Sequence, residues 1–225
     1  MIDVYIKRTI LYFAHFVLFL YLKLISIIPN FEWFPVSKKL RIPRHLALTF
    51  TDESNRLDLN SITDLICWCK QLGVKYITLY DDLGRLKAKQ KELYRFLDYK
   101  ASLIDDSTSN ENEPTMMQLK HISYIKGLTI LSRLDGRQKF VTDIKDLLKV
   151  EPAKIDLDLV QKHVGWTCDP ELLIIFGFQQ CLHGFPPWQL RLTEILSIPS
   201  HRNVTYRMFI DCLEKYSRTT QRLGA

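Results

Sequence analysis

The sequence lacks the short motifs by which many nucleotide-binding and metal-binding proteins are recognised. It contains no GxGxxG fingerprint, no Walker phosphate loop and no internal repeat. Its five cysteines are odd in number, and Cys67-Trp68-Cys69 is not a CxxC pair, so neither a disulfide framework nor a zinc site is indicated. We therefore expect buried free thiols and a reducing compartment.

The chain also lacks a strong basic run with interleaved aromatic residues. Lysine and arginine number 31 against 25 acidic residues, which gives a formal net charge of +6. Such a balance suits nucleic acid, anionic lipid or a phosphorylated substrate, and without a basic run nucleic acid is the weakest of these candidates. A length of 225 residues, 47% of them hydrophobic, fits one domain plus a short extra segment.

A long apolar run is present at residues 9–29. It has the length of about 20 residues that a membrane-spanning helix needs, and Lys23 near its end can reach the headgroups. An interfacial helix, a signal peptide and a core helix remain alternatives. More basic residues follow the run than precede it, so the positive-inside rule predicts a cytosolic main domain. We expect a membrane segment at 1–30, a proline-containing linker at 31–43 and a folded domain at 44–225.

The rest of the chain alternates between strand and helix patterns. Apolar, β-branched stretches predict strands at 45–51, 75–80, 127–132 and 171–178. Helical spacing predicts helices at 61–72, 86–103, 137–149, 157–164, 188–196 and 206–216, and a polar stretch at about 105–115 predicts a loop. This order indicates an α/β domain with a mostly parallel sheet flanked by helices. Ligands of such sheets bind outside the carboxyl ends of the strands, where Asp81-Asp82 add negative charge.

One stretch carries a family resemblance: DPELLIIFGFQQCLHGFPPWQLRLTEIL, residues 169–196. It resembles the last signature block of the cis-prenyltransferases, D-P-D-L-L-I-R-T-S-G-E-x-R-L-S-N-F-L-L-W-Q-x-x-Y-x-E, and follows it without a gap. HLALTFT at 45–51 resembles the family's H-V-A-I-I-M-D-G-N strand, and CKQLGVKYITLY at 69–80 resembles its C-x-x-x-G-I-x-x-V-T-L-Y segment. The resemblance covers the chain from about residue 45 onward and implies a cis-prenyltransferase-like domain.

The departures from this pattern fall on the residues that bind diphosphate. In active members an Asp after the first strand holds Mg²⁺, and here that position is Thr51, a neutral hydroxyl. The two arginines and the serine of the active pattern correspond to Ile175, Cys181 and His183. Arginine suits this role because its guanidinium binds two phosphate oxygens at once. The isolated chain is therefore expected to be inactive, unless Asp52 replaces the missing ligand after a one-residue slip.

A family-like domain whose binding residues are altered resembles one subclass of the family. This is the accessory subunit of the heteromeric enzyme that makes dehydrodolichyl diphosphate, the subclass that includes the Nogo-B receptor. Its members carry an N-terminal membrane segment, an inactive domain and a C-terminal R-x-G, which here is Arg222-Leu223-Gly224. The resemblance implies that this tail binds substrate diphosphate in a partner's active site, which also holds the Mg²⁺.

The same resemblance implies partners and a location. The partners are a catalytic cis-prenyltransferase subunit, the membrane lipid, and isopentenyl and farnesyl diphosphate in a shared site, at the endoplasmic reticulum membrane. Candidates for the subunit interface are Phe185, Trp188, Arg191 and Glu194. Two other functions remain open: a self-sufficient enzyme with a rearranged site, and a membrane receptor or scaffold with an inactive fold.

Overall fold

A computed structural model describes residues 40–51, 57–105, 125–150, 156–164, 168–179 and 181–220. The expected membrane segment, Asp52, most of the linker at 31–43 and the tail at 222–224 lie outside these ranges, as does the expected polar loop beyond residue 105. Within the described ranges, no helix is both long and apolar enough to cross a bilayer.

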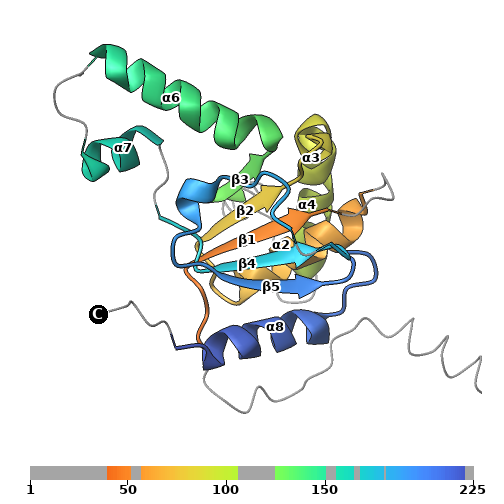
Figure 1. The fold of residues 1–225 in the computed structure, drawn as a ribbon. Coiled ribbons are helices and arrows are strands. Elements are labelled where there is room, and N and C mark those ends of the chain that lie inside the picture. The colour runs from red at the N-terminus through yellow and green to blue at the C-terminus, as the bar shows by residue number, and fades with distance from the viewer. Residues whose placement is uncertain are drawn as a thin grey trace, which may run out of the picture. The chain divides into compact units, whose positions relative to one another are not determined.

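A five-stranded sheet forms the centre of the domain (Figure 1). All its neighbouring strands are parallel, in the order β3 (Leu128–Leu131), β2 (Tyr76–Tyr80), β1 (His45–Phe50), β4 (Leu172–Phe176) and β5 (Glu194–Ile198). The central strands β1 and β4 are buried along their whole length, as strands covered on both faces are. The expected α/β class with a parallel sheet is confirmed.

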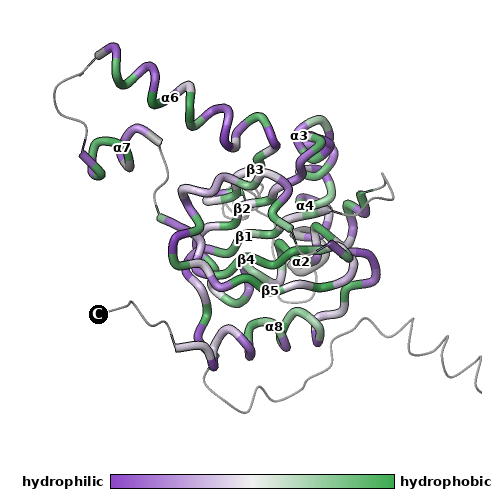
Figure 2. The backbone as a smooth tube through the Cα atoms, viewed as in Figure 1, coloured by the Kyte–Doolittle hydropathy of each residue, from purple (hydrophilic) through white to green (hydrophobic). Residues whose placement is uncertain are grey.

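Three helices cover one face of this sheet. α2 (Leu59–Gln71), α4 (Gln90–Asp105) and α8 (Tyr206–Arg218) pack with alternate residues of β1, β2 and β4 in the main hydrophobic core. Trp68 of α2 contacts the ring of Phe209 of α8 at 6.0 Å between centroids. Figure 2 shows the apolar residues gathered along the strands that these helices cover.

The opposite face holds a smaller apolar cluster. It consists of Ala47, Tyr80, Leu173, Ile175 and Phe185. Beside it, the 3₁₀ turn η1 (Arg133–Asp135) leads into α6 (Arg137–Val150), which contacts α7 (Leu157–Val164). Most described side chains of α6 are exposed or half-buried, and the helix extends from η1 past the edge of the sheet (Figure 1). The two faces of the sheet are therefore covered unequally.

The prediction of a helix at 188–196 is wrong. A 3₁₀ turn, η2 (Pro187–Gln189), is followed by the edge strand β5. Along β5 the exposure alternates, with Ile195 45% exposed and Ile198 4% exposed. This strand forms because its backbone pairs with β4 over five residues, a long-range contact that helical spacing in the local sequence does not reveal.

The helix expected at 86–103 is interrupted near its start. The short helix α3 spans Arg85–Ala88 and is capped by Lys89, and α4 begins at Gln90. Leu86, Leu93 and Leu97 are nevertheless all buried in the main core. The apolar spacing looks continuous in the sequence because both helices turn their apolar side to the same core.

Candidate functional site

Thr51 lies at the carboxyl end of β1, beside the end of β4. Its backbone N–H and its hydroxyl both donate to the carbonyl of Phe176, at 2.9 Å and 3.1 Å. Gly177 permits this approach, since a Cβ at that position would lie 2.1 Å from the Thr51 Oγ1. The hydroxyl at the family's metal-binding position therefore stabilises the end of the sheet.

Ile175 occupies the position of the first missing arginine, near the same edge. Its side chain is 2% exposed and belongs to the apolar cluster that includes Tyr80 and Phe185. A guanidinium in this place would be buried without a partner, which costs several kcal/mol. The position now contributes to packing and offers nothing to a diphosphate.

The segment 181–185 closes over this cluster. The Tyr80 hydroxyl donates to the carbonyl of His183 at 2.8 Å, and the rings of Tyr80 and Phe185 lie 5.2 Å apart. Burial, with a smaller effect of nearby Asp82, raises the pKa of Tyr80 to about 12, so it remains a donor at neutral pH. Phe185, predicted to lie at the interface, is only 1% exposed and belongs to the buried apolar cluster.

The same segment brings Gly184 against the turn at Gly136. A Cβ on Gly136 would lie 2.4 Å from the Gly184 carbonyl oxygen. Cys181, at the predicted position of the second missing arginine, is exposed. The expectation of buried thiols is therefore wrong for Cys181, whereas Cys67, Cys69 and Cys212 are buried. The segment 181–185 and the turn at Gly136 therefore lie in close contact.

The two carboxylates after β2 differ in their surroundings. Asp81 is fully buried and accepts from the Arg85 guanidinium at 2.6 Å and 3.0 Å, and from the backbone N–H groups of Arg85 and Leu86. Asp82 lies 4.0 Å from Nδ1 of His183. The expectation that both carboxylates make this edge negative is therefore wrong for Asp81, because Arg85 compensates its charge.

The residues that the structure describes at this edge do not fit a magnesium ion. Mg²⁺ prefers hard oxygen ligands, commonly one or two carboxylates together with substrate phosphates. Thr51 and Asp81 already use their oxygens within the fold, and across the described part of the chain no group of three or more His, Cys, Asp or Glu side chains is arranged to hold a metal. We therefore derive no metal-dependent step for this domain.

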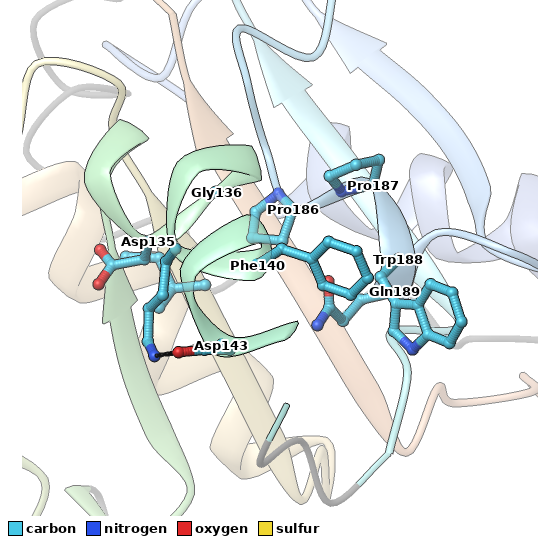
Figure 3. Close-up of a pocket in the computed structure, with 10 residues that line it drawn as sticks. Asp135, Gly136, Phe140, Asp143, Pro186, Pro187, Trp188 and Gln189 are labelled. Atoms are coloured by element: carbon cyan, nitrogen blue, oxygen red, sulfur yellow. Dashed lines mark hydrogen bonds and ion pairs between the residues drawn. The ribbon is translucent and has the colours of Figure 1, made fainter. Parts of the chain in front are cut away.

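Of the other interface candidates, Trp188 lines a small pocket of about 70 Å³ (Figure 3). The ring of Trp188, on η2, stacks on that of Phe140 of α6 at 5.3 Å. Arg191 lies 5.9 Å above the same indole and pairs with Asp169 at 2.9 Å. Glu194 is half-buried at the start of β5. Trp188, Arg191 and Glu194 thus lie close to one another in the chain, outside the buried cluster.

The last described helix ends at the opposite edge of the sheet. The hydroxyl of Tyr216, in the last turn of α8, donates to Glu171 just before β4 at 2.9 Å. Arg41, four residues before β1, lies over the Tyr216 ring at 4.2 Å. The end of α8 therefore lies at the amino ends of β1 and β4, a strand length of about 17–20 Å from their carboxyl ends.

Comparison with known proteins places the chain in a family. No family model matches. The chain is 31% identical over 214 residues to the mouse dehydrodolichyl diphosphate synthase complex subunit Nus1, covering 87% of this chain and 71% of that protein. The chain belongs to the Nus1 family. The human Nus1 subunit is 29% identical over 202 residues, with 82% of this chain and 67% of that protein covered.

Relatives beyond the Nus1 family are isoprenyl transferases. Isoprenyl transferase 1 of Corynebacterium diphtheriae is 23% identical over 82% of each chain. Lavandulyl diphosphate synthase of Lavandula x intermedia matches in structure with a TM-score of 0.56 at 20% identity, over 82% of this chain and 99% of that one. A probable undecaprenyl diphosphate synthase of Campylobacter jejuni gives 0.53 at 14%, over 84% and 100%. The cis-prenyltransferase fold and the resemblance to the accessory subunit are confirmed.

Proposed function

We propose that this Nus1-family chain is the non-catalytic but required subunit of a heteromeric cis-prenyltransferase. Its partner subunit would condense isopentenyl diphosphate onto farnesyl diphosphate to give dehydrodolichyl diphosphate, for dolichol synthesis and protein glycosylation. The main support is Ile175, which is buried in an apolar cluster where active members of the resembled family have an arginine. A buried isoleucine at this position offers no positive charge to stabilise a diphosphate.

In this proposal the tail completes the partner's active site. Arg222 binds diphosphate oxygens with its guanidinium, Gly224 lets its backbone N–H approach an oxygen closely, and Leu223 packs against an apolar wall. The Mg²⁺ belongs to the partner's site, where a carboxylate is available. The catalytic subunit thus supplies the metal and most of the diphosphate-binding groups.

The place where α8 ends supports action in a partner's site. Residues 220–224 span at most about 18 Å when fully extended. The distance to the carboxyl edge of this chain's own sheet is about as long, a strand length of 17–20 Å in a straight line, and the path around the domain is longer. A tail that leaves from the amino edge is therefore poorly placed to serve its own degenerate site.

The proposal also assigns a surface and a location. Trp188, Arg191 and Glu194 contact the catalytic subunit, and the buried Phe185 packs in the neighbouring apolar cluster. The run at 9–29 anchors the complex in the endoplasmic reticulum membrane with the domain in the cytosol. A membrane location suits a long polyprenyl product, which is apolar.

Incorporation of isopentenyl diphosphate tests the division of labour. The full chain is purified alone and co-purified with a catalytic homologue that carries the first-strand Asp and both arginines. We expect no incorporation by the chain alone and much faster turnover by the pair than by the homologue alone. Turnover by the isolated chain would refute the proposal, and a stable pair with unaltered turnover would favour a scaffold.

A further inference from the structure

The segment Leu40–Arg44, which we call the strap, crosses the end of α8 before entering β1. The backbone N–H of Arg41 donates to Oγ of Ser217 at 3.0 Å. The guanidinium of Arg41 lies 4.2 Å above the Tyr216 ring and reaches the carbonyl of Thr219 at 3.5 Å. A single strap residue thus contacts three residues in and just after the last turn of α8.

Glu171 ties the strap and α8 to the sheet. Its Oε2 accepts from the backbone N–H of Arg44 at 3.0 Å and from the hydroxyl of Tyr216 at 2.9 Å. Tyr216 is 2% exposed, and burial raises the pKa of its hydroxyl, which therefore stays a donor at neutral pH. Leu40 and Ile42 pack against the main core, so the strap is held at both ends.

These contacts lie at the C-terminal end of α8, where a helix has the fewest hydrogen bonds of its own. The last carbonyls of a helix have no partner within it, and a nearby arginine satisfies them and complements the helix dipole. In α8, Thr219 closes the helix by donating its N–H to Tyr216 and its hydroxyl to Lys215. Arg41 then donates to the carbonyl of Thr219 itself, one residue before the end of the described chain.

We infer that Arg41 is a positioning residue that fixes the direction in which the tail leaves α8 toward the partner's active site. This inference rests on the proposed function of the tail. Because a small misplacement of a catalytic group reduces the rate steeply, holding the helix end fixed contributes to turnover without contact with substrate. The strap therefore links the segment before β1 to the end of α8.

A double-mutant cycle in the co-purified complex tests the coupling. We expect Arg41→Ala to lower kcat about tenfold, since misplacement of about 1 Å can cost up to a hundredfold, with little change in KM. In a complex that already carries Arg222→Ala, Arg41→Ala should have no further effect. Equal losses in both backgrounds would mean that Arg41 acts through stability alone, and the inference would fall.

Arg218→Ala is the matched control. It removes the same charge from the same helix end, but Arg218 is mainly exposed and pairs only weakly with Glu214 at 3.5 Å. Turnover should be unchanged in this variant. Arg41→Lys keeps the charge and should recover part of the lost rate, because an ammonium still lies over the Tyr216 ring.

Hydrogen exchange separates failure of this inference from failure of the proposed function. Amides of residues 217–220 should exchange faster in Arg41→Ala than in the unaltered full chain or in Arg218→Ala. If Arg222→Ala leaves turnover unchanged, the proposed tail function is wrong even where this difference appears. If exchange at 217–220 does not change in Arg41→Ala, the strap does not hold the helix end and the inference is overturned.

Discussion

The two edges of the sheet have opposite chemistry. At the carboxyl edge, where relatives of the resembled family bind diphosphate, Ile175 is buried and the Thr51 hydroxyl is bonded to the backbone. At the amino edge, Arg41, Glu171 and Tyr216 join the start and the end of the domain. At the carboxyl edge, Ile175 and Thr51 contribute to packing and backbone bonding. At the amino edge, polar side chains hold the end of α8, the last described helix.

This contrast bears on how the fold is stabilised. The sheet is stabilised by apolar residues on both faces, and these do not depend on the metal-binding and diphosphate-binding residues. Replacing a functional arginine by isoleucine removes the cost of placing a charge near the core. In the proposed function, turnover depends instead on the tail and on the contacts at the end of α8.

Removing the tail should give the largest effect. Arg222→Ala, or truncation after Gln221, should reduce turnover of the complex about 100-fold to 1,000-fold, because a preorganised diphosphate donor is lost. Co-purification should show an intact complex. Measurement of isopentenyl diphosphate incorporation decides the matter, and a normal rate would contradict the assigned role of the tail.

Restoring the arginine at the carboxyl edge should destabilise the domain. Ile175→Arg buries an unpaired charge and should lower the free energy of unfolding by about 3 kcal/mol or more, without creating activity. Ile195→Arg, on the neighbouring strand and 45% exposed, is the control and should change stability by about 0.5 kcal/mol or less. Urea denaturation measures both, and equal effects would mean that Ile175 is not packed as described.

Restoring the carboxylate should have a moderate effect. In Thr51→Asp an ionised side chain replaces a donor and faces the Phe176 carbonyl, which should cost about 1–3 kcal/mol of stability. Thr51→Ser keeps the hydroxyl and should cost less. Thermal unfolding of the pair, with and without Mg²⁺, checks this. Stabilisation of Thr51→Asp by Mg²⁺ would show that this edge still forms a metal site.

The smallest effect concerns pH at the amino edge. Burial lowers the pKa of His45, whose ring contacts the carbonyl of Cys168 at 2.8 Å and the hydroxyl of Thr78 at 2.9 Å. The unfolded state binds this proton more readily, so stability should fall as pH drops below about 6.5. In His45→Gln the melting temperature should fall less between pH 7.5 and 5.5. An unchanged pH dependence would mean that another group is responsible.

Sequence patterns predicted elements well where the local signal and the fold agree. The helix at 157–164 matches the structure, and the buried strand expected at 171–178 is found, shortened to 172–176. The match to the family block at 169–196 also predicted Ile175 as an altered position, and the match at 45–51 predicted Thr51; no observation tests these two assignments. The long-range contacts at the two edges of the sheet were not predictable, because Tyr80 meets His183 across 103 residues and Arg41 meets Ser217 across 176.

The sequence by itself determined the fold class and the family, and it predicted the loss of the metal-binding and diphosphate-binding residues, because these depend on residue types in a fixed order. Only the tertiary structure decided that residues 194–198 form a strand, that Asp81 is compensated by Arg85, and that the end of α8 lies at the amino edge. The physical reason is that strand pairing, burial and ion pairing join residues far apart in the chain. These interactions form only when the chain folds, so local sequence patterns do not reveal them.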